Sequence, residues 1–156
     1  MKITGFISSS WGRFEYCFSE DRKLRKLRLP FLEHVPSIPF SITQSDLLPL
    51  EEYIEKYVKG KASDTFGFEL SGTPFQQKVW KELLKIEIGK TMRYAEVAQN
   101  IGHPLSYRAV AQACAKNPLP LIVPCHRVVG KSNLGGYAYG IAWKKFLLAL
   151  EKREKR

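Results

Sequence analysis

The sequence is organised around one stretch in its last third, Val123-Pro124-Cys125-His126-Arg127-Val128-Val129. Proline and the β-branched residues around the cysteine disfavour helix, which predicts a stiff extended turn following a short strand. An imidazole and a guanidinium stand next to the thiol, and both kinds of neighbour can lower a thiol's pKa. Cys125 is therefore the candidate nucleophile. The alternative is that Cys125 is only a small buried hydrophobic residue and His126 an ordinary structural histidine.

Length and composition indicate an ordinary globular protein. A chain of 156 residues can hold one domain or two small ones, and its 44% hydrophobic and 26% charged residues indicate neither disorder nor a membrane span. The three cysteines, Cys17, Cys114 and Cys125, have no paired spacing, and the N-terminus lacks a signal segment. These features predict a reducing, cytoplasmic setting, which suits a chain that needs a free thiol.

The net charge of +10 belongs to the second half of the chain. Residues 1–70 hold ten Lys/Arg and ten Asp/Glu, whereas residues 71–156 hold fifteen Lys/Arg and five Asp/Glu. Such an excess is typical of a surface that meets a polyanion, but many lysine-rich surfaces are only solvated faces. Charge alone leaves nucleic-acid binding open.

Residues 1–70 predict a small N-terminal α+β domain, an antiparallel sheet with a helix. Apolar residues alternate, as in a strand meander, over residues 3–7, 13–18 and 24–29. Helical spacing then predicts a helix between Leu47 and Val58, and residues 65–70 resemble another short strand. Cys17 and His34 are too few for a metal site, so both are interpreted as structural.

Residues 71–156 predict a helical, winged-helix-like second domain that opens on a strong helix signal. Thr73 can be the N-cap, Pro74 suits the first helical position, and Gln76 can complete a capping box, with Gly89 ending the helix. Two further short helices are expected over residues 94–101 and 107–116, the second capped by Ser106. Two short helices joined by a tight turn predict a helix-turn-helix.

The helix expected over residues 107–116 has two different faces. Val110, Ala113 and Cys114 fall on one side and are expected to pack inward. The other side is small and flat, which would let the backbone approach a DNA groove, with Arg108 as the one long side chain able to reach between bases. The alternative is an alanine-rich helix chosen for propensity alone.

The C-terminal residues predict a glycine-bearing loop, residues 130–140, and then a final helix. That helix carries apolar residues at core spacing, namely Trp143, Phe146, Leu147 and Leu150. Glu151 follows them directly. A glutamate entering a basic tail is usually exposed, and a buried partner for His126 is the alternative.

Six motifs stand in order: Gly72-Thr73-Pro74-Phe75-Gln76 with Val79-Trp80, Tyr94, Arg108-Ala109-Val110, Asn117-Pro118, Pro124-Cys125-His126-Arg127-Val128-Val129 and Leu147-Leu148-Ala149-Leu150-Glu151. Together they closely resemble the O6-alkylguanine-DNA alkyltransferases, also called methylated-DNA-protein-cysteine methyltransferases. The resemblance covers about residues 66–151, and the first domain matches in general character only.

This resemblance implies a suicide DNA repair protein. Cys125 would accept the alkyl group of O6-alkylguanine, chiefly methyl, while His126 acts through a water as general base and Glu151 orients the imidazole. Asn117 would brace the turn that carries the thiol. The damaged guanine would have to rotate out of the duplex to reach the sulfur. The thioether product cannot easily regenerate the thiolate, so each molecule would react once, without metal or organic cofactor.

The resemblance also implies the DNA contacts. Arg108 would fill the gap left by the guanine, with its helix, which also presents Ala109 and Gln112, in the minor groove. Tyr94 would assist the rotation and donate a hydrogen bond to the purine, and Arg93, where relatives often have serine, would add a phosphate contact. The partner would be double-stranded DNA containing O6-alkylguanine, bound by a monomer away from any membrane.

The substrate pocket would be lined by Val128, Tyr137, Ala138 and Tyr139. The family's pocket loop usually reads Gly-Tyr-Ser/Ala-Gly-Gly, whereas this chain has Tyr139 at the fourth position. Tyr139 is therefore expected to narrow the pocket.

Two other functions stay open, a non-catalytic sensor of alkylated DNA and a helix-turn-helix regulator. Relatives that only bind alkylated DNA lack the cysteine, which this chain has. A regulator should carry long polar base readers on its recognition helix, where this chain has mainly Gln112 among alanines.

Overall fold

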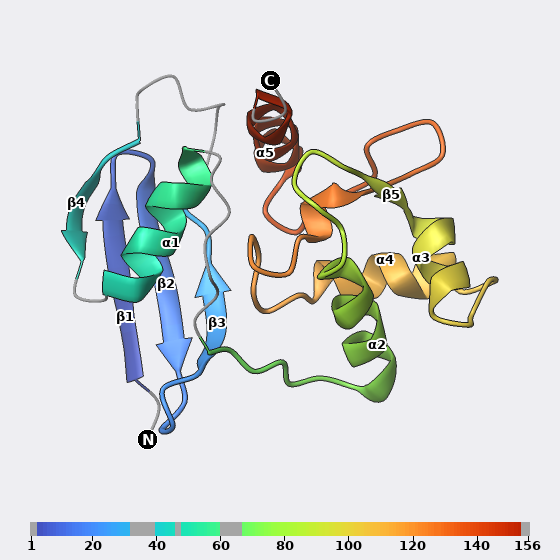
Figure 1. The fold of residues 1–156 in the computed structure, drawn as a ribbon, viewed down its shortest axis with the longest axis horizontal. Helices are drawn as coiled ribbons and strands as arrows, with labels where there is room; N and C mark the ends of the chain where they lie inside the picture. The colour runs from blue at the N-terminus through green and yellow to red at the C-terminus, as the bar shows by residue number, and fades with distance from the viewer. Residues whose placement is uncertain (1–2, 32–39, 46–47, 60–66, 154–156) are drawn as a thin grey trace.

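The N-terminal part of the protein is an antiparallel sheet with one helix across a face (Figure 1). The computed structural model describes residues 3–31, 40–45, 48–59 and 67–153. The strands β1 (Ile3–Ser9), β2 (Gly12–Phe18), β3 (Leu24–Arg28) and β4 (Ile42–Ser45) lie in the order β3-β2-β1-β4, and the helix is α1 (Leu48–Val58). The antiparallel sheet and its helix are as predicted.

Alternation of side chains decides which face of this sheet is buried. Phe14 and Tyr16 of β2 are buried, whereas Arg13 and Glu15, which alternate with them, are exposed. In α1, the core positions Leu50, Ile54 and Tyr57 are buried at helical spacing. The sheet therefore keeps one polar face open to solvent.

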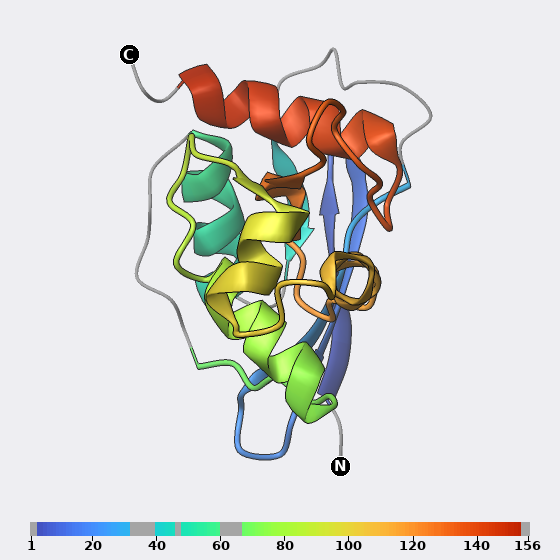
Figure 2. The ribbon, with the colours of Figure 1, turned by 90° about the vertical axis from the view of Figure 1, so that its right-hand side faces the viewer.

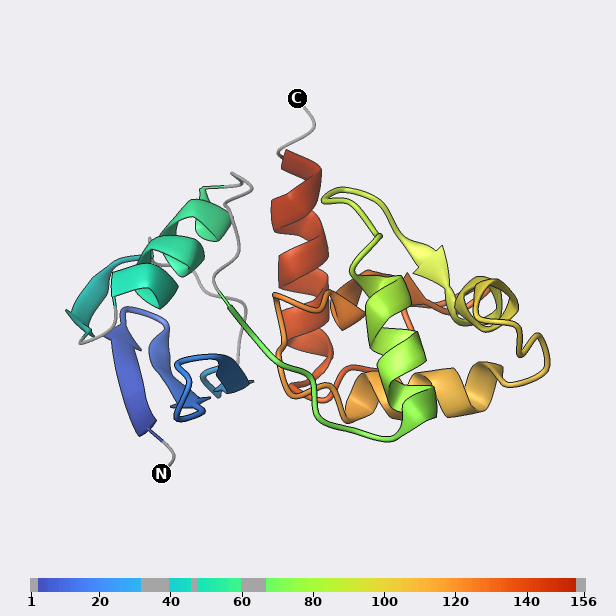
Figure 3. The same ribbon diagram turned by 60° about the horizontal axis from the view of Figure 1, so that its bottom comes forward.

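The C-terminal part is mainly helical. Its elements are α2 (Pro74–Leu83), β5 (Met92–Arg93), α3 (Tyr94–Asn100), α4 (Tyr107–Ala115), the 3-10 turn η1 (Cys125–Arg127), β6 (Val128–Val129) and α5 (Ile141–Arg153). Helices α2, α3 and α4 pack against one another (Figure 2). The short strands β5 and β6 pair in parallel. Helix α5 stands between this cluster and the N-terminal sheet (Figure 3).

The helix ends follow the sequence signals only in part. Thr73 and Gln76 form the predicted capping box at the start of α2. However, α2 ends at Leu83, before Gly89, which instead takes a left-handed conformation in the following turn. Ser106 occupies the N-cap position of α4, but its side chain makes no capping hydrogen bond, which corrects that expectation.

The edge strand β3 and the residues directly after it join the two parts of the protein. The Leu27 backbone N–H donates to Pro118 O at 2.9 Å, and the Trp143 indole donates to Pro30 O at 2.8 Å. These bonds connect the sheet with the segment before the nucleophile and with α5.

Two expectations fall partly or wholly outside the described residues. His34 lies outside them, as do the first two residues of the strand expected over residues 65–70; among the other four, only Phe68 forms a bridge, an isolated parallel one with Leu24. Within the ranges that the structure describes, no helix is long and apolar enough to cross a membrane.

Candidate active site

The candidate nucleophile lies in a buried 3-10 turn. Residues 119–128 are all buried, and residues 125–127 form η1 directly before β6. The sequence predicted an extended turn after a strand, and this is wrong: turns precede Cys125 and the strand follows it. Pro124 sits at the N-cap with φ −81° and ψ 64°, so the proline stops any longer helix from forming through the thiol.

Asn117 ties together the two ends of the segment that runs from Leu119 to Cys125. Its amide Nδ2 donates to Val123 O at 2.7 Å and to Cys125 Sγ at 3.2 Å, while its Oδ1 accepts the Leu119 backbone N–H at 2.9 Å. A buried amide with both ends bonded is held in one orientation. The sulfur is therefore fixed by a donor that favours its anionic form.

The charges around the thiol differ from the sequence prediction. Burial raises the pKa of Cys125, which is 4% exposed, and the Asn117 hydrogen bond and the charge of Lys144 oppose that rise. The Arg127 guanidinium is directed elsewhere, donating to Glu151 and, at 2.6 Å, to Ile86 O. The expectation that Arg127 lowers the thiol's pKa is thus corrected.

His126 and Glu151 form a buried pair. Of the two alternatives for Glu151, the structure thus has the buried partner of His126 and not an exposed residue entering a basic tail. Ionised Glu151 can only accept, so His126 donates its Nε2 proton to Oε2 at 2.5 Å, leaving Nδ1 as an acceptor. Nδ1 is buried without a hydrogen-bond partner among the described residues. Burial lowers the pKa of His126 although Glu151 acts in the opposite direction, so the imidazole is neutral and its Nδ1 can accept a proton.

Two residues that the sequence did not predict complete the surroundings of Glu151. Tyr57 of α1 donates to Oε2 at 2.5 Å, and Arg127 Nε donates to Oε1 at 2.7 Å. Burial alone would raise the pKa of Glu151, but the hydrogen bonds and charges of His126 and Arg127 lower it to about 2. Tyr57 stands at a buried core position of α1, and no local sequence signal distinguishes a core tyrosine from a partner of Glu151.

A cavity of about 220 Å³ opens beside the thiol. It is lined by Tyr94, Ala111, Cys114, Ala115, Cys125, Gly136, Tyr137 and Ala138. Two predicted lining residues, Val128 and Tyr139, do not line it; the Tyr139 hydroxyl lies 3.3 Å from Leu27 O, to which it donates. The ring of Tyr139 lies 5.9 Å from that of the lining residue Tyr137, so a narrowing of the pocket by Tyr139 stays a prediction.

Cys114 is a second thiol on the wall of this cavity. It packs inward from α4, as predicted, and is 7% exposed. Burial and, to a smaller extent, the nearby Cys125 raise the pKa of Cys114 to about 12, although the charge of Lys144 opposes this rise. Cys114 is thus protonated at neutral pH and does not compete as a nucleophile.

The predicted DNA-contact residues lie on or next to α3 and α4, the helices that supply the cavity residues Tyr94 and Ala111. Arg108 and Gln112 of α4 are exposed and Ala109 is half-buried. Arg93, also exposed, lies at the N-cap of α3 without a capping hydrogen bond, as its replacement of a serine predicts. Two further exposed side chains precede Arg108 without having been predicted, Leu105 at 92% and Tyr107 at 47% exposure.

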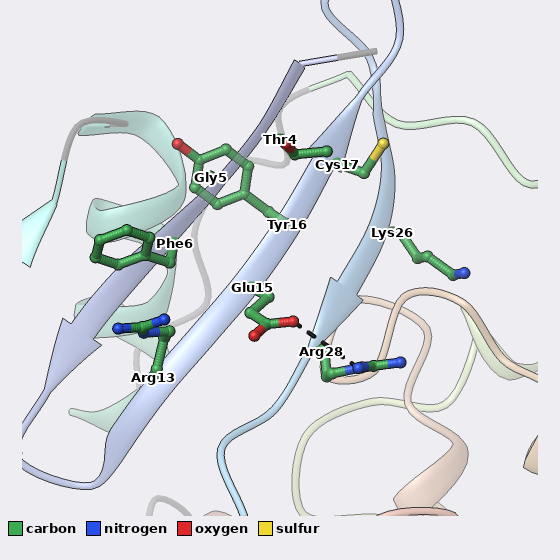
Figure 4. A pocket seen from close by; sticks show the side chains of 9 residues that line it. All are labelled: Thr4, Gly5, Phe6, Arg13, Glu15, Tyr16, Cys17, Lys26 and Arg28. Atoms are coloured by element: carbon green, nitrogen blue, oxygen red, sulfur yellow. Dashed lines mark ion pairs between the residues drawn. The ribbon is translucent and has the colours of Figure 1, made fainter.

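A larger hollow of about 620 Å³ lies on the open face of the N-terminal sheet (Figure 4). Its lining includes the exposed side chains Phe6, Arg13, Glu15 and Arg28. Glu15 and Arg28 pair across it at 3.9 Å. None of the predicted site residues lines this hollow, so the candidate active site is the smaller cavity at Cys125.

Comparison with known families agrees with this geometry. A family model described as 6-O-methylguanine DNA methyltransferase, DNA binding domain, matches residues 74–153. The chain belongs to this methyltransferase family. The match includes the cavity, the nucleophile and Glu151, and leaves out the N-terminal sheet.

Relatives of this family member carry matching names. A protein of Acanthamoeba polyphaga mimivirus, named "Probable methylated-DNA--protein-cysteine methyltransferase", is 53% identical over 103 residues, covering 64% of this chain and 68% of the relative. A Methanocaldococcus vulcanius protein named "Methylated-DNA--protein-cysteine methyltransferase" is 50% identical over 95 residues, covering 61% of this chain and 58% of the relative. The match thus spans less than two thirds of the second relative.

Solved structures of the family extend the likeness to nearly the whole chain. Mycobacterium tuberculosis OGT in complex with DNA superposes with a TM-score of 0.81 at 37% identity, covering 97% of this chain and 93% of that one. A Methanococcus jannaschii O6-methylguanine DNA methyltransferase gives a TM-score of 0.68 at 33% identity, covering 90% and 88%. The N-terminal part therefore shares the family fold.

Proposed function

We propose that the protein transfers the alkyl group of O6-alkylguanine in DNA, chiefly methyl, irreversibly to Cys125. The observation that carries this proposal is the thiol itself, buried yet open to a cavity on one side. A neutral histidine with a free acceptor nitrogen stands next to it in the chain. Membership of the methyltransferase family supports the same reaction.

The reaction needs one proton transfer and one displacement. The Cys125 proton passes through a water to His126 Nδ1, and Glu151 stabilises the resulting imidazolium through Nε2. The sulfur–carbon bond forms as the bond from carbon to O6 breaks, and the bonding pair leaves with guanine. Tyr94, on the cavity wall, donates to the purine as that charge develops. The product is a thioether, so each molecule reacts once.

The buried position of the sulfur requires the base to leave the duplex. A stacked guanine cannot reach a thiol that is 4% exposed, whereas an extruded base could enter the cavity. Helices α3 and α4 would act as a helix-turn-helix within a winged-helix-like domain (residues 71–156), beside an N-terminal domain (residues 1–70). Arg108 would replace the extruded base, and one monomer would act on double-stranded DNA, inside the cell.

Labelled DNA tests this function. The protein is incubated with DNA carrying O6-methylguanine labelled in the methyl group, and acid-stable label per protein is counted. We expect a plateau near one label per protein, absent in Cys125→Ala. Tight binding of the lesion without any label would indicate a sensor, and sequence-selective binding of undamaged DNA would indicate a regulator; either result contradicts the proposal.

A further inference from the structure

Lys144 is a fully buried lysine beside the candidate active site. Its residue exposure is 0%, although it lies on α5 next to the exposed Lys145. Among the ion pairs found in the described residues, none includes Lys144. A buried ammonium without a carboxylate is costly, so its hydrogen bonds must replace most of the lost hydration.

Three acceptors surround the ammonium, and each comes from a different segment of the chain. Nζ lies 2.6 Å from Val128 O, 2.9 Å from Gly136 O and 3.4 Å from the Tyr94 hydroxyl oxygen. An ammonium has three N–H groups, so this set uses all of them. One side chain thereby connects the strand after the nucleophile, the pocket loop and the first residue of α3.

The helix that carries Lys144 also carries Glu151. The two residues are seven positions apart, which places them on the same side of an α-helix. Glu151 contacts His126, while Lys144 contacts the cavity residues Tyr94 and Gly136. Helix α5 therefore presents an acid to the base and a cation to the pocket.

The pocket loop bound by Lys144 also packs tightly against Tyr94. Gly135 has φ +72°, and a Cβ there would lie 2.6 Å from the Tyr94 hydroxyl. The pocket loop thus lies directly against the tyrosine that the proposed reaction uses. Small movements of this loop would displace Tyr94 or close the cavity.

Lys144 is also the cation that acts on the nucleophile. Its charge lowers the pKa of the Cys125 thiol, whereas Arg127 is bonded to Glu151. The titratable groups that interact with Lys144 are Tyr94 on α3, Cys114 on α4, and Cys125 and His126 on η1. A positive charge facing these groups favours a thiolate over a thiol and a neutral over a charged imidazole.

We propose that Lys144 is a positioning residue for alkyl transfer. Its ammonium holds Tyr94 and the pocket loop in place against β6, and it supplies the positive charge that favours the Cys125 thiolate. The predicted effect of Lys144 on the repair rate rests on the proposed function. Its effect on the thiol is independent of DNA and can be measured separately.

The test compares Lys144→Met with Lys145→Met, its exposed neighbour on α5. The first readout is the single-turnover rate of methyl transfer at saturating DNA, together with the DNA dissociation constant. The second is the pH midpoint of Cys125 alkylation by iodoacetamide, read on the Cys125 peptide by mass spectrometry so that the other cysteines do not contribute. Lys144→Gln, which keeps a hydrogen-bond donor but loses the charge, is the second variant should Lys144→Met not fold.

We expect the transfer rate of both Lys144 variants to fall at least about tenfold with DNA affinity unchanged, and the thiol midpoint to rise by about one pH unit. Lys145→Met should leave all three measurements at wild-type values. A folded Lys144 variant with a wild-type midpoint and rate would overturn the proposal. Absence of transfer by the wild type would refute the proposed function, while the thiol midpoints would still decide whether Lys144 acts on Cys125.

Discussion

At the scale of single residues, the site separates a base from a nucleophile by giving each its own partners. Glu151 accepts from His126, Arg127 and Tyr57, so it stays ionised and fixes the proton of His126 on Nε2. Cys125 depends instead on Asn117 and Lys144. The proton that the reaction releases therefore has one destination, Nδ1.

Glu151→Gln tests this division of roles. The variant loses the charge that stabilises an imidazolium and leaves the buried Arg127 without a counter-ion. We expect methyl transfer to slow by about 10²-fold and the free energy of unfolding to fall by about 3 kcal/mol, measured by single-turnover kinetics and urea unfolding. Glu87→Gln removes an exposed carboxylate paired with Lys90 and is the matched control. Equal rates for both variants would exclude a catalytic role for Glu151.

At the scale of elements, sequence signals predicted structure best where they act locally. The capping box placed the start of α2 correctly, and alternation placed β1, β2 and β3. The sequence missed β4, a short strand after a proline-rich stretch, and the 3-10 turn at Cys125, whose shape depends on Asn117. Local patterns do not encode such tertiary contacts.

Helix α4 is the element that we expect to meet DNA. Arg108 is exposed on it, and its guanidinium lies 6.0 Å from the centre of the Tyr107 ring. Arg108→Ala should slow repair of duplex DNA by about tenfold or more, because nothing then fills the gap in the stack. The free base O6-methylguanine needs no extrusion and should react at nearly the wild-type rate. Lys78→Ala, an exposed basic residue on α2, is the control, and equal slowing on both substrates would rule out this role.

At the scale of the whole molecule, the N-terminal part contributes to the site. Tyr57 reaches Glu151 from α1, and the Leu27–Pro118 hydrogen bond supports the segment before the nucleophile. The sequence predicted the motif residues Cys125, His126 and Glu151, which this arrangement brings together. It could not predict Tyr57 or Lys144, because their contacts join segments that are distant in the chain.

The buried pair makes stability depend on pH. Burial lowers the folded-state pKa of His126 below its ordinary 6.5, so stability falls as the pH drops below about 6.5 and the unfolded chain takes up the proton. The pKa of Glu151 falls from 4.5 to about 2 on folding, so its contribution is present above pH 4.5 and is lost between these values. We expect the urea midpoint to decrease over this range, and less steeply below pH 4.5 in Glu151→Gln. A wild-type urea midpoint that does not change with pH would contradict these pKa shifts of His126 and Glu151.

Mass spectrometry of the protein after reaction tests the central claim most directly. The protein is mixed with an excess of duplex DNA containing O6-methylguanine, and its intact mass and its peptides are measured over time. The account predicts the replacement of one hydrogen by one methyl group per molecule, located on Cys125, with no further lesion repaired afterwards. Repair of many lesions by each molecule, or a methyl group on any other residue, would contradict it.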